Sequence, residues 1–263
     1  MKFCSLASGS SGNCEYLEYN NTKILIDAGL SGKKIEGLLK EIEVNPHDLD
    51  AVFVTHEHID HIKGLGVMAK RYNLKIFATD ETIHGAEKKI KNIPMENVYI
   101  FKNGLPFRFK DLDVLPMQTF HDCILGSSFV FTNGKKKVSI LTDTGYVNPE
   151  MLGVMEGSDL FFLEANHDEK MLLEGPYPWA LKQRILSNRG HLSNEFSKDV
   201  LLKLLKREKE QVVLAHLSKD NNTPKLAEDF VVQGLMEKDF VEGRDFYIEV
   251  APRDNPSQMF KVK

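Results

Sequence analysis

One short stretch of the chain concentrates the side chains that bind metal ions in proteins. The apolar run 51–54 is followed by four of them: His56, His58, Asp60 and His61. Imidazole and carboxylate groups are ligands for Zn, Mn and Fe. His56 and His58 are two residues apart, so a tight loop can bring both to one ion. Asp60 and His61 follow at once and can face a second ion. A loop of surface histidines is the alternative, but such clusters usually bind metal.

Buried strands are expected to position this loop and the other candidate residues. The run 51–54 predicts a strand, and α/β sheets place ligand sites at the carboxyl ends of their strands. Other polar residues follow apolar runs in the same way: Asp27 after Lys23–Ile26, His121 after Leu112–Phe120, Asp143 after Lys137–Leu141, Glu164 after Asp159–Leu163, and His216 after Val212–Ala215. Strands are also expected at Lys2–Ala7, Cys14–Tyr19, Lys75–Thr79, Gly126–Thr132, Asp245–Val250 and Met259–Val262.

Amphipathic helices alternate with these strands. The segment 32–43 carries Ile35, Leu38 and Leu39 at helical spacing, which predicts a helix with one buried face. Further helices are expected around residues 65–72, 83–90, 196–205 and 227–235. Strand followed by helix, repeated along the chain, is typical of an α/β fold.

Length and composition limit the class of protein. The chain has 263 residues, of which 42% are hydrophobic and 27% charged, so we expect one globular domain, 1–263. No apolar run approaches the ~18 residues of a membrane span, and the first residues resemble no signal peptide. Cys4, Cys14 and Cys123 lack metal-type spacing, which favours free thiols in a reducing cytoplasm. The net charge of −4 excludes a global basic field for nucleic acid.

The motif His-x-His-x-Asp-His after a buried strand resembles the metallo-β-lactamase superfamily. The resemblance implies a four-layer αβ/βα sandwich with two divalent metal ions, Zn²⁺, Mn²⁺ or Fe. Asp27 matches the early aspartate that usually orients the histidine loop through hydrogen bonds. The implied metal ligands are, for one ion, His56, His58 and His121; for the other, Asp60, His61 and His216; and, bridging both, Asp143. Zinc β-lactamases usually have Cys in place of Asp143 and lack His61, which argues against β-lactam hydrolysis.

A second motif, Gly190-His191-Leu192-Ser193-Asn194, resembles the His-x-Ser/Thr motif of superfamily nucleases. There the histidine binds the scissile phosphate or protonates the leaving oxygen, so His191 joins Asp60 and Asp143 as a catalytic candidate. The alternative is a histidine that only precedes a helix cap. Ser193 and Asn194 are candidates both for that cap and for substrate binding.

The turn Ser8-Gly9-Ser10-Ser11-Gly12-Asn13 has two interpretations. It resembles a loop of superfamily phosphodiesterases, in which small side chains expose backbone N–H groups to phosphate. Ser10, Ser11 and Asn13 are then substrate-binding candidates. Glycine and serine are also ordinary hairpin residues, so a plain connection is an equal alternative.

Six segments between residues 6 and 222 together resemble the YycJ/WalJ branch of the superfamily. Three of these segments distinguish this branch from the rest of the superfamily: Leu-Glu-Ala-Asn-His-Asp, Gly-His-Leu-Ser-Asn and His-Leu-Ser-Lys-Asp-Asn-Asn. This resemblance implies a cytoplasmic 5′-to-3′ exonuclease on double-stranded DNA, with links to DNA repair and to cell-wall and division control. The nucleophile would be a hydroxide shared by the two metals.

Other functions stay open from the residues alone. A pocket closed by the loop 175–179 would favour a hydrolase of a small phosphodiester, such as a cyclic nucleotide. A path of lysines from Lys135–Lys137 to the metals would favour a polymer substrate. A metal-holding regulatory partner without catalysis is a third possibility, and a thioester hydrolase shares the histidine loop. The roles of Glu164 and His167 are left open, and metal ligation by His167 is given little weight.

Overall fold

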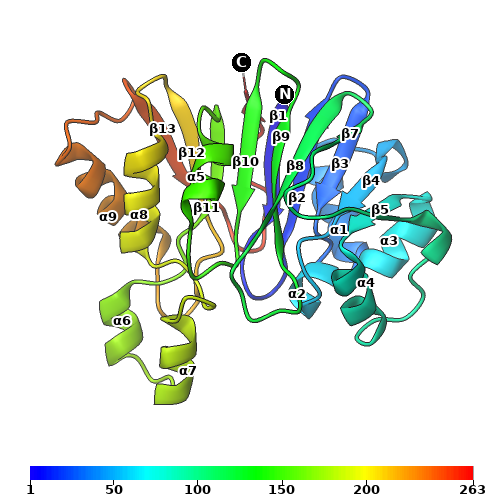
Figure 1. Cartoon of the computed structure of the whole chain (residues 1–263), viewed down its shortest axis with the longest axis horizontal. Coiled ribbons are helices and arrows are strands. Elements are labelled where there is room, and N and C mark those ends of the chain that lie inside the picture. The colour runs from blue at the N-terminus through cyan, green and yellow to red at the C-terminus, as the bar shows by residue number, and fades with distance from the viewer. Residues whose placement is uncertain (263) are drawn as a thin grey trace. The chain divides into compact units, whose positions relative to one another are not determined.

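The computed structural model describes residues 1–262, which group into two compact units. Unit 1 contains residues 1–118, 123–127 and 252–262; unit 2 contains residues 119–122 and 128–251. Each unit is a β-sheet with helices, so the predicted α/β class is confirmed (Figure 1). The single domain over residues 1–263 stays a prediction. Within residues 1–262, no helix has the length and apolar character needed to cross a membrane.

The sheet of unit 1 changes from antiparallel to parallel along its strand order, β14-β1-β2-β3-β4-β5-β6. Strands β1 to β3 form an antiparallel meander, whereas β3, β4, β5 and β6 are parallel neighbours. The strands are β1 Lys2–Ala7, β2 Cys14–Tyr19, β3 Thr22–Ile26, β4 Ala51–Phe53, β5 Lys75–Ala78, β6 Val98–Ile100 and β14 Phe260–Lys261. Another antiparallel pair of this unit consists of β7 Phe107–Phe109 and β8 Leu112–Gln118.

Helices α1, α3 and α4 connect the parallel strands of unit 1 and bury their apolar faces. The helical elements are α1 Gly32–Glu41, η1 Pro46–Asp48, α2 Ile59–Ile62, α3 Leu65–Tyr72, α4 Asp80–Glu87 and η2 Met95–Asn97. Ile35, Leu38 and Leu39 of α1 are buried, as their spacing predicts, in one cluster with Val52 and Met68. Each such side chain contributes about 1.5–3 kcal/mol on full burial. This core holds the strand that precedes the histidine loop.

Unit 2 has parallel strands at its centre. Its strands follow the order β13-β12-β11-β10-β9, and only the β9–β10 pair is antiparallel. They are β9 Ser127–Thr132, β10 Lys137–Leu141, β11 Leu160–Glu164, β12 Glu210–Ala215 and β13 Phe246–Val250. Because β10, β11 and β12 are parallel neighbours, their carboxyl ends lie at the same edge of the sheet.

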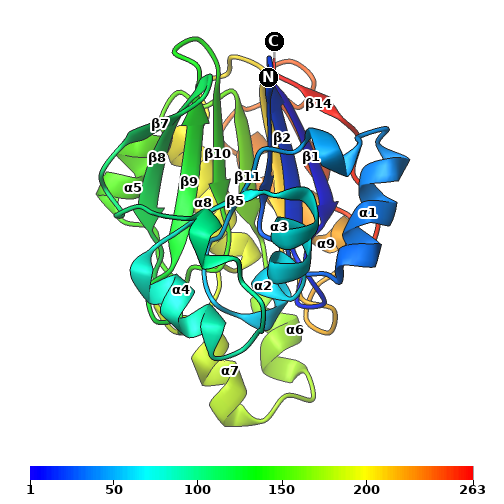
Figure 2. The ribbon, with the colours of Figure 1, turned by 90° about the vertical axis from the view of Figure 1, so that its right-hand side faces the viewer.

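The helices of unit 2 fall into two groups. α8 Asn194–Leu204 packs against α9 Pro224–Met236 and α5 Pro149–Met155, and α9 packs on β13. α6 Glu169–Glu174 and α7 Trp179–Ile185 form a hairpin that projects past the carboxyl ends of the unit 2 strands in both views (Figures 1 and 2). Helices α5, α6 and α7 were not predicted, because their short segments show no long apolar period. The loop expected at residues 175–179 is the turn between α6 and α7.

Candidate functional site

In unit 1, two parallel strands carry the metal-binding candidates. Asp27 follows β3 and the histidine loop follows β4, and the Asp27 N–H donates to the Phe53 carbonyl at 2.8 Å. The backbone of Asp27 is left-handed, with a φ of 60°. This conformation costs a non-glycine residue free energy, and it is typical of functional sites. It turns the carboxylate back toward the loop that carries His56 and His61.

The Asp27 carboxylate fixes the hydrogen-bonding state of two histidines. Its Oδ2 accepts from the His61 Nδ1–H at 2.6 Å and from the Thr55 hydroxyl at 2.7 Å. Because the only hydroxyl proton of Thr55 goes to Asp27, Thr55 Oγ1 must accept from the His56 Nδ1–H, 3.0 Å away. Both imidazoles therefore present the Nε2 lone pair on the side away from Asp27, as metal-ligating histidines do. Burial raises the pKa of Asp27, although the hydrogen bonds from His61 and Thr55 oppose this effect.

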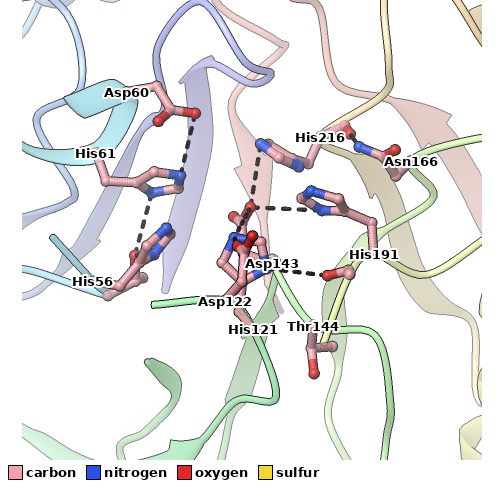
Figure 3. Close-up of polar contacts among 12 residues, drawn as sticks. His56, Asp60, His61, His121, Asp122, Asp143, Thr144, Asn166, His191 and His216 are labelled. Atoms are coloured by element: carbon pink, nitrogen blue, oxygen red, sulfur yellow. Dashed lines mark hydrogen bonds and ion pairs between the residues drawn. The ribbon is translucent and has the colours of Figure 1, made fainter. Parts of the chain in front are cut away.

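The three imidazole rings of the loop pack together. The centroid of the His56 ring lies 4.5 Å from that of His58 and 4.1 Å from that of His61. Asp60 Oδ2 lies 3.7 Å from His61 Nε2 (Figure 3). Unit 1 thus brings together the four donors predicted from its sequence, and imidazole with carboxylate is a donor set that suits divalent metals.

The Gly/Ser turn contacts the histidine loop through Asn13. Asn13 Oδ1 accepts from the Gly9 N–H at 2.8 Å, so its Nδ2 is the donor toward His61 Nε2, 3.0 Å away. A metal on His61 Nε2 would take the place of this hydrogen bond. Ser10 and Ser11 are exposed, and the N–H groups of Gly9, Gly12 and Asn13 already donate within unit 1.

Gly29 shows how closely the loops of unit 1 approach one another. Its N–H donates to the Asn13 carbonyl, and the Asn13 N–H donates to the Asp60 carbonyl, each at 2.8 Å. A Cβ at Gly29 would lie 1.6 Å from the Asp60 oxygen, so only glycine fits. The turn, the Asp27 loop and the histidine loop are therefore joined by backbone hydrogen bonds.

In unit 2, three neighbouring strand ends carry the candidates. Asp143 follows β10, Glu164 ends β11, and His216 follows β12. Asp143 and His216 are left-handed, with φ values of 54° and 55°, as Asp27 is in unit 1. One donor or acceptor atom from each of Asp143, Glu164, His191 and His216 lies within 4.8 Å of the others. Figure 3 shows Asp143, His191 and His216 pointing toward one another.

Glu164 is the residue whose role the sequence left open, and it organises unit 2. Its Oε1 accepts from the Nδ1–H groups of His191, at 2.6 Å, and His216, at 3.0 Å. Its Oε2 accepts from the N–H groups of Thr144 and Leu192, at 3.1 and 3.2 Å. Burial alone would raise the pKa of this fully buried carboxyl, but His191 and the hydrogen bonds lower it to about 2. Glu164 is therefore ionised at neutral pH.

His191 carries the opposite charge. Burial opposes its protonation, but the Glu164 carboxylate, with a smaller contribution from Asp143, raises the pKa of His191 to about 9. Because Nδ1–H is held by Glu164, the second proton is on Nε2, and the side chain keeps 20% of its surface exposed. A protonated, accessible imidazole is suited to donate a proton to a leaving oxygen.

His121 is held by the loop that precedes His191. Its Nδ1–H donates to the Gly190 carbonyl at 3.1 Å, which leaves Nε2 as the candidate ligand atom. The Arg189 guanidinium donates to the His121 carbonyl from Nε and Nη2, at 3.1 and 3.0 Å. Burial lowers the pKa of His121, while Asp143 opposes the shift, so the ring favours the neutral form that binds metal.

Ser193 and Asn194 form hydrogen bonds that support the loops of unit 2. Ser193, one of the two predicted cap candidates, is the N-cap of α8, and its hydroxyl donates to Glu169 at 3.0 Å. The Asn194 amide pairs with Asn222, whose Nδ2 also donates to the Ala165 carbonyl at 2.9 Å. Both predicted substrate-binding residues are 1% exposed. Their hydrogen bonds join the loops that carry Glu164, His191 and His216.

His167 contrasts with the other histidines of unit 2. Its side chain is 1% exposed, and neither ring nitrogen has a hydrogen-bond partner among residues 1–262. Burial lowers the pKa of His167 to about 4, although Glu164 opposes the shift. His167 is therefore neutral at pH 7. Its backbone carbonyl accepts from the Asn194 N–H at 2.9 Å.

The lysines of the β9–β10 turn lie at the end of β10 opposite to Asp143. Lys136 Nζ pairs with Asp159 at 2.6 Å, and Lys137 Nζ donates to the Glu156 carbonyl at 2.7 Å. Asp159 precedes β11, so these lysines lie at the amino ends of the strands. Within unit 2 they form no path to the Asp143 cluster.

Comparison with known proteins adds sequence relatives along the whole chain. Residues 22–217 match the family described as "Beta-lactamase superfamily domain". The chain is 41% identical over 263 residues to exodeoxyribonuclease WalJ of Streptococcus pneumoniae serotype 2 (strain D39 / NCTC 7466), covering 99% of this chain and 98% of that protein. It is 42% identical over 259 residues to exodeoxyribonuclease YycJ of Bacillus anthracis, covering 98% of each. The solved structure of the metallo-beta-lactamase fold protein YhfI from Bacillus subtilis matches with a TM-score of 0.71 at 16% identity, covering 98% of this chain and 100% of that one.

Proposed function

The chain belongs to the β-lactamase superfamily, and on this premise we propose that it is a two-metal exonuclease that degrades double-stranded DNA from the 5′ end. Membership confirms the predicted metallo-β-lactamase fold and the YycJ/WalJ-like branch. The protein is a metal-dependent hydrolase. The substrate and the polarity belong to the proposal, and the names of the two full-length relatives support DNA.

Seven residues are proposed to hold two divalent ions, Zn²⁺, Mn²⁺ or Fe. His56, His58 and His121 would bind one ion, Asp60, His61 and His216 the other, and Asp143 both. The orientation of the imidazoles supports this set, because Asp27, Thr55, Gly190 and Glu164 occupy the Nδ1 atoms of four of them. Two such ions supply a nucleophile at neutral pH and offset the charge of a phosphate.

The observation that carries the proposed reaction is the 2.6 Å contact between His191 Nδ1 and Glu164 Oε1. The ion pair keeps His191 protonated, and Nε2–H is the proton available to the leaving 3′ or 5′ oxygen of a cleaved phosphodiester. Asp143 Oδ1, 3.7 Å from His191 Nδ1, adds to the negative field that holds this proton. His191 is thus the proposed general acid, while Asp60 and Asp143 act as metal-binding catalytic residues.

Substrate contacts are proposed at two segments. In unit 1, Ser10 and Ser11 are exposed on the Gly/Ser turn, and Asn13 is released toward substrate when His61 binds metal. In unit 2, Ser193 and Asn194 would act through backbone placement, since their side chains are buried. We also propose a cytoplasmic location and a role in DNA repair linked to cell-wall and division control, on the resemblance to the branch.

End-labelled duplex DNA tests the proposal. The purified chain, loaded with Mn²⁺ and with its metals counted, is incubated with a duplex labelled at the 5′ or at the 3′ end. We expect about two ions per chain and early release of the 5′ label as mononucleotide. His61→Ala should lose both metal and activity, whereas His84→Ala, an exposed histidine on α4, should keep both.

Other outcomes separate the alternatives. Two metals with intact DNA and hydrolysis of a cyclic nucleotide would overturn the exonuclease in favour of a small phosphodiester. Two metals without hydrolysis of either would favour the regulatory, non-catalytic role. Release of the 3′ label first would contradict the proposed polarity.

A further inference from the structure

The α6–α7 hairpin is built onto the loops that carry the unit 2 candidates. α6 begins five residues after Glu164, and the His191 N–H donates to the carbonyl of Ile185, the last residue of α7, at 3.1 Å. The Tyr177 hydroxyl donates to Asp220 at 2.7 Å, in the loop that follows His216. The hairpin is therefore hydrogen-bonded to the loops that carry His191 and His216.

Polar contacts within the hairpin make it a defined surface. Lys182 Nζ donates to the carbonyl groups of Leu173 and Gly175, at 2.6 and 2.7 Å, which joins α7 to the end of α6. Lys182 is 8% exposed, so its ammonium group stabilises the junction between α6 and α7. Arg184 forms an ion pair with Asp122, the neighbour of His121. These contacts tie the hairpin to the loops that carry His121 and His191.

The hairpin exposes large apolar side chains at this position. Trp179, the only tryptophan of the chain, is 61% exposed at the start of α7, and Leu173 of α6 is 47% exposed. Burial of an indole ring gives more free energy than that of most side chains, so an exposed one on a fixed hairpin indicates a binding surface.

The charge of the same segment indicates the partner. Residues 175–193 contain no Asp or Glu but three basic residues, Lys182, Arg184 and Arg189, in a chain whose net charge is −4. Arg184 and Arg189 are exposed residues; the Arg184 guanidinium pairs with Asp122, and that of Arg189 donates to the His121 carbonyl. An exposed aromatic ring and exposed arginines on one segment suit single-stranded nucleic acid, whose bases stack on aromatic rings and whose phosphates pair with arginine.

We propose that Trp179 stacks on an unpaired base at the end of the DNA substrate, and that Arg184 contacts its phosphates. The hairpin then holds the frayed strand while its terminal phosphodiester lies at the unit 2 candidates. This inference rests on the proposed function and assigns its substrate-binding surface. It makes Trp179 a specificity-determining residue for polymers and leaves small phosphodiesters unaffected.

Because the chain has one tryptophan, its fluorescence reports this contact directly. The Mn²⁺-loaded protein is titrated with a duplex that has a short 5′ overhang and nuclease-resistant phosphorothioate linkages. We expect the overhang to quench tryptophan emission, since stacked bases quench indole, and a blunt duplex to quench it less. Binding measured by fluorescein anisotropy without any change in emission would overturn the proposal, and so would an absence of binding.

Substitution gives a second test. Trp179→Ala should raise KM for the overhang duplex about tenfold, Trp179→Phe should restore most of the loss, and kcat/KM for bis(p-nitrophenyl) phosphate should stay unchanged. Tyr247→Ala, which removes a ring 46% exposed on β13, is the matched control. Equal losses on DNA and on the small ester would overturn the proposal. A wild-type protein that cleaves the small ester but neither binds nor cleaves DNA would overturn the exonuclease as well.

Discussion

Each unit contains one buried carboxylate that orients histidines, and the two carboxylates differ in charge environment. Asp27 of unit 1 accepts from one imidazole and from the hydroxyl and N–H of Thr55. Glu164 of unit 2 accepts from two imidazoles and two backbone N–H groups. Burial raises the pKa of Asp27, whereas the pKa of Glu164 is lowered to about 2.

A buried carboxylate that accepts from imidazole therefore has a different effect in each unit. A carboxylate with a neutral hydroxyl and one imidazole fixes a tautomer, which is what a metal ligand needs. A carboxylate with four donors, one of them a charged imidazole, also keeps a proton on its partner. Unit 1 is thus suited to metal binding alone, and unit 2 to metal binding combined with proton transfer.

Of the predicted substitutions, removal of the Glu164 carboxylate should have the largest effect on activity and stability. Glu164→Ala leaves the N–H groups of Thr144 and Leu192 buried without acceptors, and lets the pKa of His191 fall toward its usual value. We expect kcat to fall about 10³-fold and stability by about 3 kcal/mol. Steady-state kinetics and urea unfolding measure the two losses. Glu174→Ala, an exposed carboxyl of α6, is the control. Full activity in Glu164→Ala would refute the organising role.

His191→Asn should separate proton transfer from metal binding. We expect kcat to fall roughly 10²–10³-fold while the metal content stays at the wild-type value. Since His191 donates only when protonated, wild-type activity should decline as pH rises through about 9, and the variant should lack that decline. Loss of metal in the variant, or an unchanged alkaline decline, would assign His191 a different role.

Asp27→Asn tests whether unit 1 is specialised for metal binding. The amide cannot accept from both His61 and Thr55 as the carboxylate does, so we expect metal affinity to fall about 10–100-fold. Isothermal titration with Zn²⁺ or Mn²⁺ measures the change. Activity should return at high metal concentration, unlike in Glu164→Ala. Asp48→Asn, at an exposed carboxyl of unit 1, serves as the control.

His167 shows what burial does to a histidine whose ring has no hydrogen-bond partner among residues 1–262. The unfolded chain binds a proton at His167 below its usual pKa of about 6.5, whereas the folded chain does so only below about 4. Stability is therefore lost as pH falls through this window, by about 2 kcal/mol between pH 7 and 5. His167→Phe should remove that part of the pH dependence in urea unfolding. An identical pH dependence in both proteins would contradict it.

The two donor sets also differed in how far they could be predicted. The unit 1 set lies within six residues, so spacing alone indicates His56, His58, Asp60 and His61 as candidate ligands. The unit 2 residues end separate strands, and only the resemblance to a family selected His121, Asp143 and His216. Glu164 also follows an apolar strand, but this position alone assigns it no role. Ser193 was predicted correctly as a helix cap, because capping depends on neighbours in sequence.

The sequence by itself determined the α/β class, the main strands and a histidine loop with the donor types of a metal site, because periodicity and short spacing are local properties. Tertiary structure decided which groups are charged and where protons reside. The pKa of His191 is raised because Glu164, 27 residues away, lies 2.6 Å from it. His167 stays neutral because the effect of burial on its pKa exceeds the opposing effect of Glu164. Electrostatic free energy depends on distance in space and on burial, and neither is fixed before the chain folds.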